Sequence, residues 1–274
     1  MTLQAARAAP PANSSAQEAQ PLVLATARDR VATLTLNNPS KRNALSTPML
    51  ESLRAELTRA AENKAVKAVI LAAAGPVFSS GHDLREFVGA DPSAVTRLLN
   101  LCTEVMELVR LHPKPVIAQV HALASAAGCQ LVASCDLVVA SSLAQFQTPG
   151  VQIGLFCSTP MIPLSRAVAP KKALEMLLTG LPISAQAAER AGLVNRVVEP
   201  AKLAEETFAL AAHIVSYSGG ILTLGKQAFY RQLALDMARA YEVGEAAMLR
   251  NSQMPDAQEG MSAFLQKRPP RWTT

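Results

Sequence analysis

Aromatic residues are scarce in this sequence: only 4% of the 274 residues are Phe, Trp or Tyr, with three Tyr and one Trp. No long run of like charges occurs either, although the formal net charge is +5. Nucleic-acid surfaces combine clustered cations with stacking aromatics, so the sequence predicts no nucleic-acid partner. The mild basic excess suits an anionic small ligand instead.

Cysteine is also scarce, and the four cysteines show no CxxC spacing. They lie in apolar segments, which predicts reduced core thiols rather than disulfides or a metal site. Charges interrupt every apolar stretch before the roughly 20 residues that a membrane span needs, and no signal-peptide core is recognisable near Met1. We therefore predict no metal site and no membrane span.

Half of the residues are apolar, enough to bury a large core. The first 20 residues differ because they are rich in Ala, Pro, Ser and Gln, which predicts a disordered tail over residues 1–20. A weak organelle transit peptide is the alternative for this tail. The cytoplasm is the preferred location, and the mitochondrial matrix is the second possibility.

Strand and helix patterns alternate after the tail. Runs of β-formers predict strands over residues 22–26, 31–37, 68–73, 115–120, 137–140 and 193–198. Capping residues and apolar spacing predict helices that start near Thr47 and Asp91, and further helices over 184–191, 200–216, 222–250 and 258–265. This alternation predicts an α/β fold with a parallel sheet and right-handed crossovers, followed by a helical C-terminal third.

Two turns rich in small residues, FSSGHDL (78–84) and ASAAGCQ (124–130), each follow a predicted strand. Ligands bind at the carboxyl ends of parallel strands, and small residues let backbone N–H groups approach a ligand there. The alternative is a pair of tight turns that need small residues for packing, since neither has a P-loop or dinucleotide fingerprint. The turns alone do not decide between these interpretations.

Five segments, in this order and spacing, resemble the crotonase (enoyl-CoA hydratase/isomerase) superfamily: NNPSKRNALS, FSSGHDL, HALASAAGCQLVASCDLVVAS, FQTPGVQIGLF and AFLQKRPPRW. The resemblance extends from about Pro21 to the end. Within the superfamily, the sequence looks most like the branch of enoyl-CoA-hydratase-domain-containing proteins. It implies a ClpP/crotonase-like spiral of ββα units over residues 21–200. It also implies a C-terminal helical region, residues 201–274, that forms homotrimers or hexamers (dimers of trimers).

The same resemblance implies that the partner is an acyl-CoA thioester, with coenzyme A as part of the substrate and no tightly bound cofactor. It assigns an oxyanion hole to the backbone N–H groups of His82 and Ala127, which would stabilise negative charge on the thioester oxygen. The resemblance also implies that these residues contact coenzyme A: Lys41, Arg42, Ser79, Ser80, Gly81, Asp83, Leu84 and Lys267. For Lys41, Arg42 and Lys267, the alternative is that each is a solvated surface cation.

The sequence departs from the family at the two glutamates that position water and move a proton in hydratases. Gln130 and Gly150 stand at these positions. An amide has no useful general-base capacity and glycine has no side chain, so conventional two-glutamate hydration is not expected. Ser158 occupies a further position at which some isomerases carry an acid, so no carboxylate substitutes locally.

Other side chains near the predicted oxyanion hole are weaker candidates for a catalytic role. Asp83 fits a structural role, in which it satisfies loop amides. The His82 imidazole could titrate near neutrality, or it could simply pack against the loop or the coenzyme. Cys129 and Cys157 have no basic neighbour in the sequence that would make them nucleophiles.

Three functions are therefore compared. The first is an acyl-CoA enzyme of non-hydratase mechanism in which the oxyanion hole does most of the work. The second is a non-catalytic CoA-thioester-binding protein, and the third is a weak enoyl-CoA hydratase (a lyase) acting through a water bound to Gln130. The third ranks lowest chemically because it lacks a base.

Overall fold

The computed structural model describes residues 20–274, so nearly all of the predicted tail lies outside the described residues. The main sheet has the strand order β1-β2-β3-β4-β6-β9, and every neighbouring pair is parallel except the β1–β2 hairpin. A smaller sheet has the order β5-β7-β8. The strands are β1 (Val23–Arg28), β2 (Val31–Leu36), β3 (Ala68–Ala73), β4 (Val116–Val120), β5 (Ala124–Ser125), β6 (Leu137–Ser141), β7 (Gln145–Gln147), β8 (Ile183–Ser184) and β9 (Arg196–Val198).

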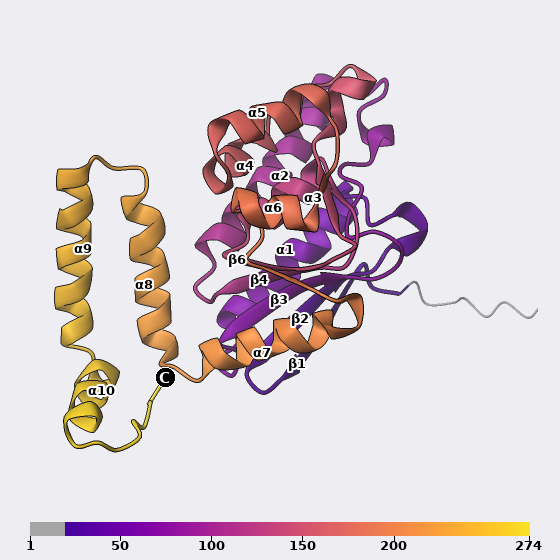
Figure 1. The fold of residues 1–274 in the computed structure, drawn as a ribbon. Coiled ribbons are helices and arrows are strands. Elements are labelled where there is room, and N and C mark those ends of the chain that lie inside the picture. The colour runs from indigo at the N-terminus through magenta and orange to yellow at the C-terminus, as the bar shows by residue number, and fades with distance from the viewer. Residues whose placement is uncertain (1–19) are drawn as a thin grey trace, which may run out of the picture.

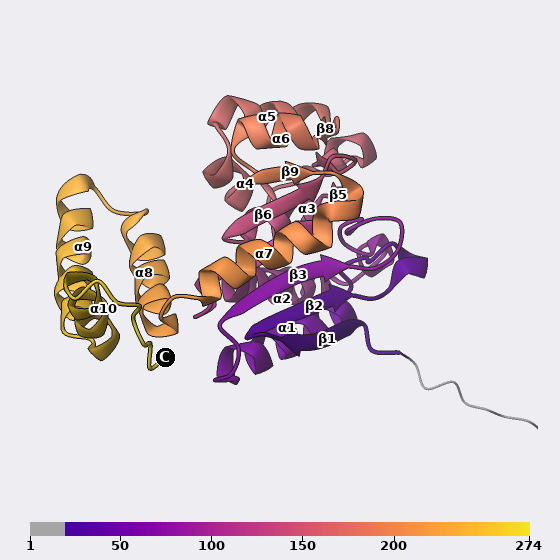
Figure 2. The same cartoon turned by 60° about the horizontal axis from the view of Figure 1, so that its bottom comes forward.

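Helices cover both faces of the main sheet, and a group of three projects away from it (Figures 1 and 2). Helix α1 packs against α2 and α7 crosses the opposite face, over β3 and β4. The helices are α1 (Thr47–Glu62), α2 (Pro92–Leu111), α3 (Ala127–Ser134), α4 (Met161–Ala167), α5 (Pro170–Thr179), α6 (Ala185–Ala191), α7 (Leu203–Val215), α8 (Gly219–Gln232), α9 (Met237–Ser252) and α10 (Pro255–Leu265).

The alternation of side chains along the strands divides the interior into two cores. Val69 and Leu71 of β3 pack in the larger core with α1 and α2, whereas Ala68 and Ile70 point to the other face. There they meet Leu203, Ala211 and Val215 of α7. Because the central strands are apolar on both faces, the sheet is buried on both sides, as parallel sheets usually are.

Local signals in the sequence account for the ends of several elements. Asp29 and Arg30 both have positive φ, 48° and 66°, which matches the tight turn of the β1–β2 hairpin. Asp91 caps α2 by accepting a hydrogen bond from the Ser93 N–H at 2.8 Å, and Pro92 follows in the first turn. The predicted β–α alternation is therefore confirmed.

Two expectations for the C-terminal third differ from the structure. The helix predicted over 222–250 is two antiparallel helices, α8 and α9, because Asp236 caps a new helix by accepting from the Arg239 N–H at 3.1 Å. Helix α7, placed by sequence in the C-terminal region 201–274, packs on the sheet. The boundary suggested near residue 200 therefore moves to the bend between α7 and α8.

Helices α8, α9 and α10 form what we call the arm, which extends beside the sheet domain (Figure 1). No apolar side chain of α8 or α9 is fully buried. Within residues 20–274, no single helix is long and apolar enough to cross a membrane, and the only pair that passes together, Pro200–Val215 and Gly219–Gln232, is bent by 101°.

The buried carboxylate of Asp256 fastens the base of the arm. It accepts hydrogen bonds from the N–H and hydroxyl of Thr273, both at 2.7 Å, and from the hydroxyl of Thr274 at 2.6 Å. Thr274 in turn hydrogen-bonds to Ser218 at the start of α8, at 2.9 Å. Burial acts to raise the pKa of Asp256, but the hydrogen bonds from Ser218, Thr274 and Thr273 outweigh it and hold the pKa well below its usual range.

This depressed pKa predicts an acid-sensitive contribution to stability. A carboxylate whose folded pKa lies below its unfolded pKa stabilises the fold at neutral pH, and that contribution is lost as pH falls from about 5 towards the folded pKa. We expect the parent to exceed Asp256→Asn in free energy of unfolding at pH 7 and the difference to shrink steadily below about pH 4. Denaturant titrations of both proteins across this range measure it; a constant difference would contradict the assignment.

Candidate functional site

The two turns predicted to form the site lie against each other. The first, residues 79–82, continues from β3, and the second, residues 124–127, joins β4 to α3. Ser79 and Ala124 form an isolated parallel bridge, and the Ser125 N–H donates to the Ser79 carbonyl at 2.9 Å. The strands thus bring together segments that are more than forty residues apart in sequence.

Each turn ends on a backbone N–H that has no acceptor in the described part of the chain. The Gly81 N–H donates to the Ser79 hydroxyl at 3.2 Å and the Ala126 N–H to the Gln147 carbonyl at 3.0 Å. The next N–H along, that of His82 in one turn and of Ala127 in the other, donates to no acceptor within residues 20–274. Ala127 is the first residue of α3, so its N–H points out of the helix end, towards any bound anion.

Backbone shape at the flanking residues keeps the two N–H groups close. Gly81 has φ +93°, and a Cβ placed on it would lie 2.8 Å from the Ala126 Cβ and 3.3 Å from the Ala127 nitrogen. Ala126 itself has φ 49° and ψ −118°, a strained conformation for a residue with a side chain. Strain of this kind persists where the surroundings impose it, and here it orients the N–H of the following residue.

Three buried polar side-chain atoms lack a partner in the described part of the chain, and all are on segments at this site. They are Nε2 of His82, Oε1 of Gln130 and Oγ1 of Thr148. Gln130 lies one turn into α3, and Thr148 follows β7, which pairs with β5 in parallel and so runs beside the start of α3. Unpaired buried polar atoms are rare, so this clustering indicates a place where a ligand or water is held.

The His82 imidazole is held beneath the turn. Its Nδ1 lies 3.0 Å from the Leu45 carbonyl, which can only accept, so Nδ1 carries the hydrogen and Nε2 is the acceptor. Burial lowers the pKa of His82, although the hydrogen bond to Leu45 opposes the shift. The ring is therefore neutral at pH 7, and it packs against Phe87 with ring centroids 5.6 Å apart.

Gly150, which the resemblance places at the position of the second glutamate, is closely packed. A Cβ added there would lie 2.8 Å from the Leu155 carbonyl oxygen and 2.9 Å from the Cys157 sulfur. Burial raises the pKa of Cys157, despite a hydrogen bond from the Gly150 N–H, and raises that of Cys129 to about 12. Both thiols are thus protonated at neutral pH, which argues against their action as nucleophiles.

The residues predicted to contact coenzyme A are distributed unevenly. Lys41 and Arg42 are exposed and directly precede residues 43–45, a segment that is hydrogen-bonded to the first turn. Ser79, in contrast, is fully buried. Asp83 pairs with Arg85 at 2.6 Å and also accepts from its N–H, and this hydrogen bonding to Arg85 holds the pKa of Asp83 low. It has the structural role expected of it. Ser80 and Gly81 lie in the turn itself, and Leu84 is exposed beside it.

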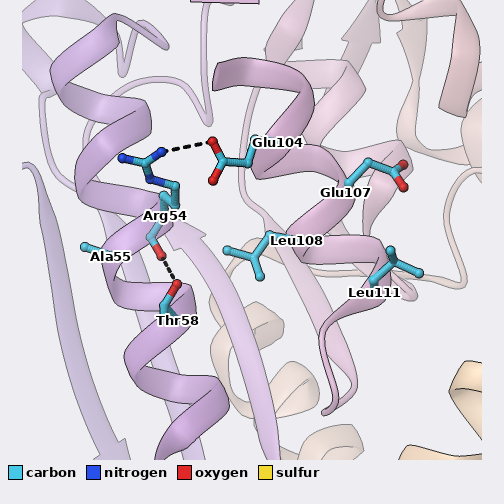
Figure 3. Close-up of a pocket in the computed structure, with 7 residues that line it drawn as sticks. All are labelled: Arg54, Ala55, Thr58, Glu104, Glu107, Leu108 and Leu111. Atoms are coloured by element: carbon cyan, nitrogen blue, oxygen red, sulfur yellow. Dashed lines mark hydrogen bonds and ion pairs between the residues drawn. The ribbon is translucent and has the colours of Figure 1, made fainter. Parts of the chain in front are cut away.

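Lys267 is not brought to this site within one chain. It directly follows α10, which belongs to the arm, whereas the two turns belong to the sheet domain (Figure 1). A separate surface hollow between α1 and α2 is lined by none of the predicted site residues (Figure 3). Arg54 and Glu104 form an ion pair of 2.9 Å across it.

Sequence reasoning missed two buried polar residues of the site, Asn43 and Thr148. Asn43 is fully buried with φ 50°, and its amide donates to the Ala74 and Val77 carbonyls at 2.7 and 3.0 Å. No periodic pattern marks either residue: the Asn43 amide donates to carbonyls more than thirty residues away, and the Thr148 hydroxyl has no partner in the described part of the chain. The only available signal for Asn43 was its place inside the NNPSKRNALS segment.

Comparisons with known proteins agree with this geometry. The family model described as enoyl-CoA hydratase/isomerase matches residues 26–274. Human "Enoyl-CoA hydratase domain-containing protein 3, mitochondrial" is 49% identical over 267 residues, covering 96% of this chain and 88% of that protein. A "Probable enoyl-CoA hydratase" of Rhizobium meliloti is 35% identical, covering 90% of this chain and 95% of that protein.

Solved structures show the same fold. The crystal structure of the human domain-containing protein 3 has a TM-score of 0.90 at 49% identity, and covers 92% of this chain and 100% of that one. An enoyl-CoA hydratase from Mycobacterium smegmatis has the same TM-score at 46% identity, covering 93% and 100%. The predicted crotonase fold and the resemblance to the domain-containing branch are confirmed. The chain belongs to the enoyl-CoA hydratase/isomerase family.

Proposed function

We propose that this chain binds an acyl-CoA thioester and holds its carbonyl oxygen between the N–H groups of His82 and Ala127. The observation that carries the proposal is the pair of adjacent backbone N–H groups without acceptors among residues 20–274, each directly after an N–H group that is engaged, that of Gly81 in one turn and of Ala126 in the other. Such preorganised donors stabilise an enolate or related oxyanion more than the ground-state carbonyl. Exposed Lys41 and Arg42 supply cations for the phosphates of the coenzyme.

Acid–base chemistry of the hydratase type does not fit the walls of the site. Gln130 cannot act as a base, and Gly150 has no room for a side chain. Neutral His82 keeps Nε2 as an acceptor, but its pKa is lowered, which makes it a weak base. The chemistry that remains is stabilisation of a thioester enolate; binding without turnover is the second candidate, favoured by the lack of a placed carboxylate.

Ala127→Pro tests the proposal by deletion of one N–H. Proline suits the first position of a helix and removes the donor, but its ring crowds the preceding Ala126 at ψ −118°, so the free energy of unfolding of the variant is measured alongside. With cinnamoyl-CoA, whose conjugated thioester absorbs at longer wavelength when its carbonyl is polarised, we expect a red shift on binding to the parent and its loss in the variant. Loss of one such donor costs about 3 kcal/mol of oxyanion stabilisation in comparable sites.

Met237→Pro is the matched control, because Met237 is the exposed first residue of α9 behind the capping Asp236. Its oligomeric state is compared with that of the parent, since Met237 is also an exposed apolar residue of the arm. It should bind cinnamoyl-CoA with the full shift. Calorimetry with CoA and butyryl-CoA measures affinity independently of the chromophore. A parent that binds no CoA thioester, or an Ala127→Pro protein that keeps the red shift, would overturn the proposal.

The proposed assembly is a homotrimer or a dimer of trimers, in which the arm contacts further copies. Its support is the exposure of large apolar side chains on helices that bury little within one chain. These side chains are Phe229, Leu233, Met237, Tyr241, Met248, Leu249, Phe264 and Leu265. For location, the animal relatives are named as mitochondrial and other relatives are bacterial, so the mitochondrial alternative gains support while the cytoplasmic preference stays a prediction.

A further inference from the structure

The structure assigns a positioning role to the Ser79 hydroxyl: it sets the relative placement of the two free N–H groups and couples them to the segment that carries Lys41 and Arg42. This inference rests on the proposed function, because it concerns the same thioester site. Ser79 is fully buried, so its side chain acts through the backbone around it.

Ser79 touches both turns at once. Its hydroxyl accepts from the Gly81 N–H at 3.2 Å, directly before the free N–H of His82. Its carbonyl accepts from the Ser125 N–H, two residues before Ala127. Its side chain also fills the space beside α3, since a Cβ on Gly128 would lie 2.7 Å from the Ser79 Cβ and 2.9 Å from its hydroxyl.

The same hydroxyl donates to the Asn43 carbonyl at 2.8 Å, which ties the turn to residues 42–45. Further bonds join the same two segments: Ser80 N–H to the Arg42 carbonyl at 3.0 Å and Leu45 N–H to the Gly81 carbonyl at 2.7 Å. Hydrogen bonds thus join residues 42–45 and 79–82 into one unit. Exposed Arg42 is the first residue of that unit, and exposed Lys41 directly precedes it.

Buried Asn43 makes this unit rigid. Its side chain accepts from the Asn38 N–H at 2.8 Å and donates to the Ala74 and Val77 carbonyls, so one amide holds three backbone groups. Arg42 and Asn43 both have left-handed backbones, φ 52° and 50°, a conformation that Asn tolerates better than most residues. Binding energy gained at the coenzyme phosphates can therefore be used to orient the His82 N–H at the thioester.

Ser79→Ala tests the role of the hydroxyl, with Ser141→Ala as the matched control. Ser141 is a buried serine whose hydroxyl also accepts from the N–H two residues later, at 3.1 Å, but it lies in β6, outside the site. We expect the two variants to lose similar stability. Only Ser79→Ala should lose much of the cinnamoyl-CoA red shift and bind butyryl-CoA about tenfold more weakly, with CoA affinity less affected.

Measurements on the parent distinguish failure of the proposed function from failure of the inference about Ser79. A parent without binding or red shift would overturn the proposed function, whereas a shifted parent together with a folded Ser79→Ala protein that keeps the shift would overturn only this inference. If Ser79→Ala does not fold, Asn43→Asp decides on the same measurement, because aspartate keeps the shape and left-handed tendency of Asn43 but lacks the amide donors. Asn195→Asp, at an asparagine that accepts from the Val138 N–H at 2.7 Å, is its control.

Discussion

Gly150→Glu is expected to destabilise the protein by about 1–3 kcal/mol and to produce no enoyl-CoA hydratase activity. The first side-chain carbon alone would lie 2.8 Å from the Leu155 carbonyl oxygen and 3.2 Å from the Cys157 nitrogen. Both are backbone atoms, so relief requires movement of the whole 150–157 segment rather than a rotamer change. A carboxylate forced in this way would not stand where a hydratase needs it.

The experiment compares four proteins for the free energy of unfolding and for crotonyl-CoA hydration. Beside the parent and Gly150→Glu, it includes Gln130→Glu with Gly150→Glu, and Gly244→Glu as the matched control. Gly244 is exposed in α9 and has nothing within 4 Å of an added Cβ, so the control should match or slightly exceed the parent's stability, since glycine is a poor helix former. A stable double variant with strong hydration would show that the segment accepts a glutamate and that the packing argument is wrong.

The fold could be predicted from the sequence because its signals are local. Alternation along β2 and β3, the hairpin turn at Asp29 and Arg30, and the Asp91 cap each act within a few residues. The predictions for the C-terminal third differ from the structure where a capping residue or tertiary packing outweighs the apolar spacing. Asp236 ended what apolar spacing predicted as one helix, and α7 joined the sheet because its apolar face fits Ile70 and Ile117.

The candidate site could be predicted only in part. The resemblance assigns the oxyanion hole to His82 and Ala127, and the structure adds that their N–H groups lack acceptors among residues 20–274. The sequence alone shows that position 150 has no side chain, and the structure adds that Leu155 and Cys157 fill the space beside it. The roles of Ser79 and Asn43 depend on hydrogen bonds across more than thirty residues, which no spacing rule reveals.

Asp136 shows the same limit at the join between the arm and the sheet domain. It directly precedes β6. In the structure its carboxylate also accepts from the Val116 N–H at 2.6 Å, from Lys226 of α8 at 2.6 Å and from the Tyr230 hydroxyl at 2.9 Å. Lys226 donates further to the Lys114 carbonyl at 3.1 Å. Only 8% of the Lys226 side chain is exposed, so the charges depend on each other rather than on water.

Burial shapes both pKa values of this pair. It raises that of Asp136 and lowers that of Lys226, and their mutual attraction opposes both shifts. A buried charge that loses its partner keeps its desolvation cost, so removal of one member of such a pair destabilises by about 3–5 kcal/mol. Replacement of both members by neutral groups costs much less, because no unpaired charge is left.

Lys226→Met is therefore expected to lower the free energy of unfolding by about 3–5 kcal/mol, and adding Asp136→Asn should recover part of that loss. Lys172→Met is the matched control: its partner Glu175 lies three residues away on the surface of α5, and such exposed pairs contribute less than about 1 kcal/mol. Denaturant titration of the four proteins measures the effects. Equal losses for the two lysine variants would show that the Asp136 contact is no stronger than a surface pair, and the arm would then depend mainly on Asp256 and the bonds around Thr274.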